Sequence, residues 1–186
     1  PADGVILYGG SADSLSIAIK NLSGSFAIAL IILLLLMAAL FRSFSDSLLV
    51  MMALPLATIG GVAALHILGL SADLLTMIGF IILLGLVVNN AILLVYQARN
   101  AERAGAERLD AVRTAVRTRL RPILMSTATT VFGMLPLVLF AGAGSELYRG
   151  LAAVIVGGML VSTLFTLILI PSLLQFDLRR TLSRND

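Results

Sequence analysis

Five long apolar stretches, separated by polar segments, dominate the pattern of the chain. A helix of about 20 residues crosses the ~30 Å hydrocarbon layer of a bilayer, and each stretch is about long enough to do so. The stretches are residues 24–41, 47–68, 74–97, 122–142 and 150–174. The pattern therefore predicts an all-α membrane protein whose transmembrane bundle of five helices lies within residues 23–176.

The longest polar interruption, residues 98–121, has a helical pattern of its own. Leu109, Val112, Val116 and Leu120 recur at helical spacing among seven arginines. This arrangement predicts an amphipathic helix lying on the cytosolic membrane surface. No aromatic residue is interleaved with the basic ones, so nucleic acid is not an expected partner.

Both ends of the chain are polar. Residues 1–22 include a short run, GVILYGG, that could form the edge of an extramembrane domain before the chain leads into the first stretch. They lack the basic region and short apolar core of a signal peptide, and the chain begins at Pro1. We therefore expect the segment to be cut from a longer protein. Residues 177–186 form a polar, basic tail.

Two features inside the apolar stretches predict helix geometry. Pro55 lies within the second stretch and is expected to kink its helix, because proline cannot donate a backbone hydrogen bond. Glycine pairs occur at residues 60–61 and 157–158, where the lack of side chains lets another helix approach closely. We expect both pairs to be helix-packing positions.

Composition excludes several classes of protein. The chain is 59% hydrophobic and 12% charged, whereas soluble domains are about 45–50% apolar and about 25% charged. It has no cysteine and one histidine, His66, so no disulfide, metal site or cofactor is expected. No phosphate-binding loop, carboxylate pair or nucleophile–histidine pair is evident, so we do not expect an enzyme.

The basic residues predict an orientation in the membrane. With five spans, Arg42, the seven arginines of residues 99–121 and the three arginines of the tail fall on one side. Only Lys20 and Arg149 fall on the other. Because basic residues gather on the cytoplasmic side, the N-terminus should lie outside the cytoplasm and the C-terminus within it.

Polar side chains inside the spans form a predicted seam. Asn89 and Asn90 lie near the middle of the third span, and Ser126 and Thr130 share a face of the fourth, together with Thr129. Arg119 precedes Ser126 by two helical turns. These groups can hydrogen-bond a charged partner, but all acidic residues lie outside the spans, so the chain has no evident proton carrier of its own. From spacing alone, two interpretations remain open: hydrogen bonds that hold helices together, and the lining of a functional path.

An ordered set of motifs resembles one family. LGLVVNNAILLV is followed by a basic loop, by RTRLRPILMSTATTVFGMLPLVL, by GAGSE and by GGMLVSTLFTLILIPSL. FRSFSDSLLVMMALPLATIGG precedes them. Together, over about residues 20–176, they resemble the C-terminal membrane half of resistance-nodulation-division (RND) efflux transporters.

The resemblance implies much about fold and partners. The family's fold has twelve membrane helices in two similar halves, so the five spans would be helices eight to twelve, and residues 1–22 would end a periplasmic domain. Such transporters are proton antiporters of the bacterial inner membrane that export drugs, including in multidrug resistance, or metal ions. The resemblance therefore implies an N-terminal half of the same protein, a homotrimer, a periplasmic adaptor and an outer-membrane channel as partners, with a periplasmic N-terminus.

Four residues match motif positions of the drug-exporting branch. Asn89 takes the place of a lysine that pairs with aspartates on the fourth helix, and Asn90 matches the asparagine that follows it. Arg119 opens the Arg-Leu-Arg-Pro motif, and Ser126 matches the hydroxyl residue after it. The resemblance implies that these residues, with Thr130, contribute to a proton relay. Without a cation at Asn89, the lysine–aspartate switch cannot operate in its usual form.

Two other functions remain as alternatives. The chain could belong to an RND-like accessory subunit of protein export, since the proton-driven Sec accessory subunits share a similar bundle. It could also be a membrane module that only packs against partners and transports nothing.

Overall fold

A computed structural model describes residues 10–140, 142 and 144–182, and in this part of the chain every regular element is a helix. The helices are α1 (Gly10–Phe41), α2 (Phe44–Met51), α3 (Ala53–Ile67), α4 (Leu74–Arg103), α5 (Arg108–Leu139) and α6 (Ser145–Leu182). Five segments are long and apolar enough to cross a membrane, with α2 and α3 counted together. The predicted all-α membrane bundle is therefore confirmed.

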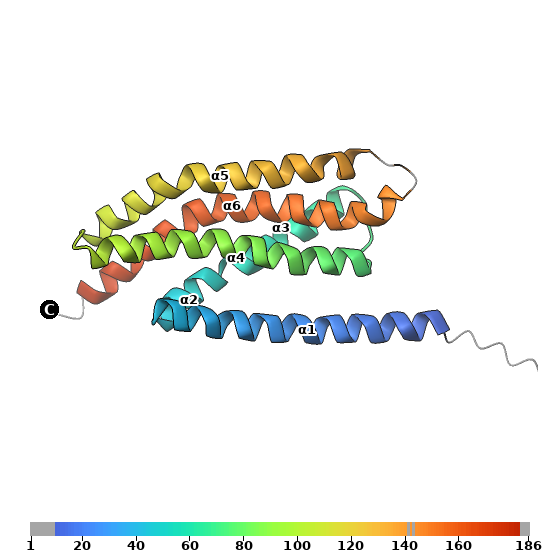
Figure 1. Cartoon of the computed structure of the whole chain (residues 1–186), viewed down its shortest axis with the longest axis horizontal. Helices are drawn as coiled ribbons and strands as arrows, with labels where there is room; N and C mark the ends of the chain where they lie inside the picture. The colour runs from blue at the N-terminus through green and yellow to red at the C-terminus, as the bar shows by residue number, and fades with distance from the viewer. Residues whose placement is uncertain (1–9, 141, 143, 183–186) are drawn as a thin grey trace, which may run out of the picture.

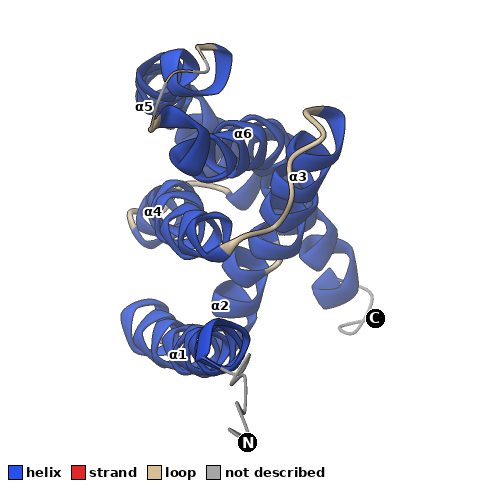
Figure 2. Cartoon of the chain, turned by 90° about the vertical axis from the view of Figure 1, so that its right-hand side faces the viewer, coloured by secondary structure: helices blue, strands red, loops and turns tan. Residues whose placement is uncertain are grey.

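Helix α6 occupies the centre of the bundle. It packs against α3, α4 and α5, whereas α1 contacts only α2 and α4. Figure 1 shows α4, α5 and α6 running side by side along the long axis, and the end view in Figure 2 places α1 and α5 at opposite edges. The apolar core lies where α3, α4 and α6 meet, around Leu83, Ile155 and Met159.

Pro55 interrupts the second span, as predicted. The span is divided into α2 and α3, with Met52 between them. Proline has no backbone N–H, and its ring crowds the carbonyl group four residues earlier, which here belongs to Met51, the last residue of α2. The interruption therefore follows from Pro55 itself.

The two glycine pairs bring α3 and α6 into close contact, as the sequence predicted. A Cβ atom added to Gly60 would lie 2.7 Å from the backbone oxygen of Gly157, and one added to Gly157 would lie 2.7 Å from the oxygen of Gly60. A Cβ on Gly158 would lie 2.2 Å from a methyl group of Leu83 on α4. These distances leave no room for a side chain, so the glycines set how closely the central helices approach.

The separate surface helix expected over residues 98–121 does not occur. Instead, α4 continues to Arg103, a turn follows, and α5 begins at Arg108 and runs without a break into the fourth span. Gly105 has a φ of 92°, and the amide of Ala106 donates to the carbonyl of Ala101, which closes the end of α4. Of the apolar residues at helical spacing, Val112 is 2% exposed and packs into the bundle, whereas Leu120, at 39%, lies on the outer surface.

The first and last helices extend into the polar ends of the chain. Residues 10–22 form the beginning of α1, continuous with the first span, and residues 1–9 lie outside the described part. The beginning of the tail continues α6 to Leu182, and residues 183–186 also lie outside it. The assignment of residues 1–22 to a periplasmic domain remains a prediction.

Large apolar side chains cover the outer surface of the bundle. Leu35 on α1 is 64% exposed, and Phe132 on α5 is 70% exposed. A soluble monomer rarely exposes contiguous apolar surface on this scale, so the outer faces are suited to lipid or to further membrane helices.

Candidate functional site

The polar seam forms where α4 and α5 run antiparallel. The hydroxyl of Ser126 donates to the amide oxygen of Asn90 over 3.5 Å, and Nη2 of Arg119 donates to the side-chain oxygen of Gln97 over 3.3 Å. Gln97 follows Asn90 by seven residues on α4, and Arg119 precedes Ser126 by seven residues on α5, as expected for antiparallel helices. Both distances exceed the usual ranges, about 2.5–3.0 Å for a hydroxyl donor and 2.7–3.2 Å for an N–H donor, so both are weak hydrogen bonds.

Arg119 retains unused hydrogen-bonding capacity within the described chain. Its side chain is half-buried, and its Nε atom is buried without a hydrogen-bond partner. A guanidinium group has five N–H donors and stays protonated in proteins. Arg119 is therefore a fixed positive charge beside the seam with donors left for an additional acceptor.

The two neighbouring asparagines face different environments. Asn90 is 8% exposed and lies in the seam between α4 and α5. Asn89 is exposed, on the same outward stripe of α4 as Gly85 and Tyr96. The structure therefore brings Asn90 and Ser126 into contact and pairs Arg119 with Gln97 about two helical turns away along the same pair of helices, while the side chain of Asn89 faces away from the bundle formed by this chain.

The hydroxyls predicted on α5 are partly satisfied within their own helix. Thr130 donates to the backbone oxygen of Ser126 over 2.9 Å, and Thr129 donates to that of Met125 over 2.8 Å. Thr130 is half-buried, whereas Thr129 is exposed. The hydroxyl of Thr130 therefore lies next to the seam, but its proton is already engaged by the backbone.

A second polar contact, which was not predicted from the sequence, lies between α5 and α6. The hydroxyls of Thr127 on α5 and Thr163 on α6 are hydrogen-bonded over 2.8 Å, and both residues are buried. Thr166, one turn further along α6, is also buried, and its hydroxyl has no partner in the described chain. The spacing of the hydroxyl residues puts Ser126, Thr129 and Thr130 on one face of α5, whereas Thr127, one residue after Ser126, points to α6.

We expect Thr163→Val to lower the free energy of unfolding by about 1 kcal/mol, since interhelical hydrogen bonds in membranes contribute about 0.6–1.7 kcal/mol. The change leaves the hydroxyl of Thr127 buried and unpaired. The double variant Thr127→Val/Thr163→Val should lose less than the two single variants together. Thr129→Val is a matched control, because that hydroxyl is exposed and bonds only its own helix. Strictly additive losses in reversible unfolding experiments would contradict the assigned contact.

A network of charged residues joins three helices at the arginine-rich end of the bundle. Nε of Arg99 donates to Asp46 over 2.8 Å, a second Arg99 nitrogen also bonds Asp46, and Nη1 donates to Glu102 over 2.7 Å. Arg108 at the start of α5 lies 3.2 Å from Glu102. Asp46 is 2% exposed, so this network ties α2, α4 and α5 together from within the protein. No local pattern predicts this network, because Asp46 and Arg99 are far apart along the chain.

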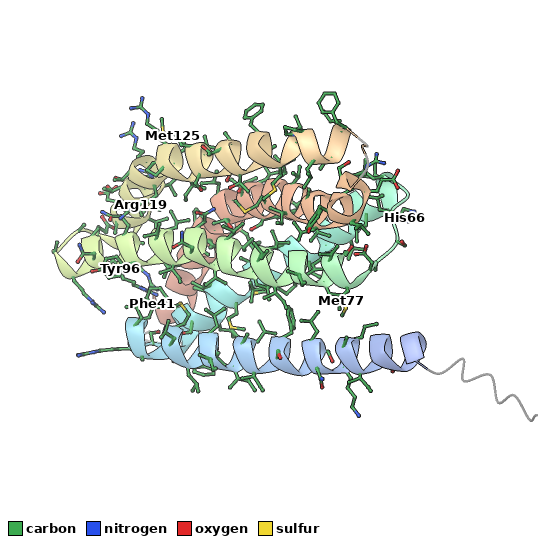
Figure 3. The ribbon with its side chains drawn as sticks, turned by 45° about the vertical axis from the view of Figure 1, so that its right-hand side comes forward. Phe41, His66, Met77, Tyr96, Arg119 and Met125 are labelled. Atoms are coloured by element: carbon green, nitrogen blue, oxygen red, sulfur yellow. The ribbon has the colours of Figure 1, made fainter. Side chains whose placement is uncertain are left out.

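No metal centre is formed by the described residues. Among them, no group of three or more histidine or acidic side chains lies close enough to hold an ion. His66 is exposed in the last turn of α3, at the end of the bundle seen in Figure 3. The polar seam is therefore the arrangement in this chain with the strongest functional potential.

Comparison with known proteins identifies the family. A family model described as the AcrB/AcrD/AcrF family matches residues 1–176. The chain belongs to this family. The match covers all five spans, so the resemblance to RND transporters that was noted from the motifs is confirmed.

Curated members of the family agree with the match. The chain is 34% identical over 180 residues to the cobalt-zinc-cadmium resistance protein CzcA of Cupriavidus metallidurans and to the cation efflux system protein CzcA of an Alcaligenes species. In each case the alignment covers 97% of this chain and 17% of the relative. The chain thus spans about a sixth of the length of these curated relatives.

A solved family structure has the same architecture over this region. The crystal structure of a heavy metal efflux pump is 32% identical, with a TM-score of 0.80, over 92% of this chain and 17% of that one. The similar backbone fold supports the five-span bundle described for this chain.

Proposed function

We propose that this chain is the C-terminal membrane portion of a proton-driven RND exporter of metal cations. In this proposal the chain is part of a secondary active transporter and not of an enzyme, and its spans are helices eight to twelve. Its part in transport is the polar seam, where Asn89, Asn90, Arg119, Ser126 and Thr130 contribute to the proton relay.

The observation that carries the proposal is the environment of Arg119. Its charge is held half-buried between α4 and α5, and its Nε donor has no partner in the described chain. A half-buried charge is costly unless it is paired, so a guanidinium with an unsatisfied donor beside a polar seam favours a missing partner. We infer that a carboxylate from another part of the transporter completes the pair and belongs to the proton relay, because no residue in the described part of the chain accepts a hydrogen bond from this Nε atom.

The outward stripe of Asn89 supports the same arrangement. Asn89 and Ser126 are both exposed on the α4–α5 side of the bundle. A further helix packed against the α4–α5 side of the bundle would contact both the amide of Asn89 and the polar seam. The relay would then lie between this chain and the N-terminal half of the same protein, with Asn89 acting as a hydrogen-bonding group instead of the drug-branch lysine.

The proposed cargo rests on the named relatives. Two curated relatives are described by cobalt, zinc and cadmium resistance or by cation efflux, and the solved structure is of a heavy metal efflux pump. The metal ion would be transported cargo and would not be held by these membrane helices.

The proposal includes an orientation and a set of partners. The arginine-rich end with Arg99 and Arg108 would face the cytoplasm, and the N-terminus would lie in the periplasm, in keeping with the positive-inside rule. The full transporter would be an inner-membrane homotrimer that works with a periplasmic adaptor and an outer-membrane channel, as the resemblance implies.

The proposal predicts that Asn89→Ala reduces metal efflux roughly tenfold or more, since hydrogen bonds to charged groups contribute about 1.5–3 kcal/mol. The test is cobalt, zinc and cadmium efflux from cells that express the transporter carrying this segment and lack other exporters. Asn100→Ala is the matched control, because Asn100 is an exposed asparagine at the far end of the same helix.

Different outcomes of these experiments test the proposed cargo, the role of Asn89 and the proton-driven mechanism separately. Protection against drugs but not against metals would contradict the proposed cargo. Equal efflux by the Asn89→Ala and Asn100→Ala variants at equal abundance would contradict the role of Asn89. Efflux that does not respond to collapse of the proton gradient would contradict the proton-driven mechanism.

A further inference from the structure

Three arginines form a stripe on the outer side of α5. Arg113, Arg117 and Arg121 recur every four residues, so they share one helix face. All three are exposed, and the side chain of Arg113 has only a loose contact of 3.9 Å with an exposed acid, Asp110. Arg117 and Arg121 have no ion-pair partner in the described part of the chain. This face therefore carries positive charge that the described residues do not neutralise.

Two open hollows flank the stripe, and Arg117 lines both of them. One, of about 490 Å³, lies between α5 and α6 and is also lined by Arg113 and Pro171. The other, of about 610 Å³, is lined by Arg117 and Arg121 at one end and by Leu124, Met125 and Ala128 at the other. Each hollow thus combines guanidinium groups with apolar wall.

The order of these residues along α5 matches the layers of a membrane. Ala128 follows Arg121 by seven residues, which places it roughly 10 Å deeper along the helix. The charged end lies toward the arginine-rich end of the bundle, and the apolar end lies within the fourth span. An amphiphile with an anionic head and a long apolar chain would match both ends at once.

We propose that this surface binds an anionic phospholipid of the cytoplasmic leaflet. Its phosphate would accept hydrogen bonds from Arg117 and Arg121, with Arg113 close by, and one acyl chain would lie along Leu124, Met125 and Ala128. Arginine suits this role because its planar group binds phosphate through paired hydrogen bonds. A zwitterionic lipid fits less well, because its own cation already balances the phosphate charge.

The site would act on the helix that carries the seam. Arg119 lies between Arg117 and Arg121 in sequence but faces α4, where it bonds Gln97. Figure 3 shows Arg119 on the side of α5 toward α4 and Met125 on the outer side. A bound lipid would therefore hold α5 from the membrane side while Arg119 faces inward. The binding itself does not depend on the proposed transport function.

The test is lipid binding by the purified transporter in detergent, measured by native mass spectrometry. The probes are dioleoyl phosphatidylglycerol, dioleoyl phosphatidylcholine and inorganic phosphate. Arg117→Gln/Arg121→Gln is compared with Arg42→Gln/Arg103→Gln, which removes the same charge from exposed positions at the same end of the bundle. Ala128→Phe fills the apolar end and leaves the charge unchanged.

We expect phosphatidylglycerol to be retained over phosphatidylcholine. The Arg117→Gln/Arg121→Gln variant should bind it roughly tenfold or more weakly, since each basic residue near a membrane surface contributes about 1 kcal/mol. Ala128→Phe should also weaken binding, and the control pair should not. Equal loss in both arginine pairs, equal retention of the two lipids, or displacement of the lipid by inorganic phosphate would each overturn the proposal.

Discussion

Asp46→Ala is expected to lower the free energy of unfolding by about 3 kcal/mol, the low end of the cost of removing one partner of a buried ion pair, because Glu102 still compensates part of the charge left on Arg99. Asp46 is 2% exposed and accepts two hydrogen bonds from Arg99, whose side chain is 19% exposed. The loss should be measured by reversible unfolding of the protein in detergent micelles.

The chain offers a matched control for this effect. Asp110→Ala removes the same type of side chain from another aspartate–arginine pair, but Asp110 and Arg113 are both about two-thirds exposed and lie 3.9 Å apart. Exposed pairs contribute at most about 1 kcal/mol, so this variant should unfold almost like the parent. Similar losses for Asp46→Ala and Asp110→Ala would show that burial of the pair does not control its energy.

A second variant distinguishes the loss of the Asp46–Arg99 contact from the cost of leaving the Arg99 charge unpaired. If the cost comes mainly from the unpaired guanidinium, Asp46→Leu/Arg99→Leu should be more stable than Asp46→Ala alone. Arg99 also bonds Glu102, which will retain part of its charge compensation in the single variant. A double variant that is less stable than Asp46→Ala would indicate that the network holds α2 and α4 together by direct attraction.

The second large effect is expected for Gly157→Val, which should destabilise the bundle by about 3 kcal/mol through overpacking. A Cβ atom at this position would lie 2.4 Å from the Cβ of Ala64 and 2.7 Å from the backbone oxygen of Gly60. The backbone cannot yield as a flexible side chain does, so α3 and α6 would have to separate. The shift should appear as a lower unfolding midpoint in detergent.

Two further variants distinguish overpacking from a general effect of valine. Gly24→Val on α1 is the control, because a Cβ there meets nothing within 4 Å in the described chain. Adding Ala64→Gly to the Gly157→Val variant should restore part of the lost stability, since it removes one of the two clashing atoms. If Ala64→Gly lowers stability further, close approach of α3 and α6 is not the cause.

The seam could be predicted in part from sequence. Asn90, Arg119 and Ser126 were expected to belong to one polar seam, and the structure places them along the α4–α5 crevice. Gln97 was not recognised as the partner of Arg119, because it lies at the end of its span among other polar residues. Adjacent asparagines also cannot share a helix face, so only tertiary packing reveals that Asn90 is buried in the seam and Asn89 is not.

Local sequence features are enough to predict the class of this protein, its five spans, the Pro55 interruption and the close-packing glycines. These features depend on local properties: the length of apolar stretches, the missing N–H of proline and the missing side chain of glycine. Motif order was also sufficient to identify the family, which the match over residues 1–176 confirmed.

The faces at which the helices meet are known only from their packing in three dimensions. The apolar spacing of residues 109–120 suited a membrane surface as well as a protein interior, and packing against the bundle placed Val112 inside it. The Asp46–Arg99 pair and the Thr127–Thr163 contact join residues far apart in the chain, so no local pattern predicts them. Their partners are fixed by the rotation and register of α2, α4, α5 and α6, which depend on the packing of all these helices together.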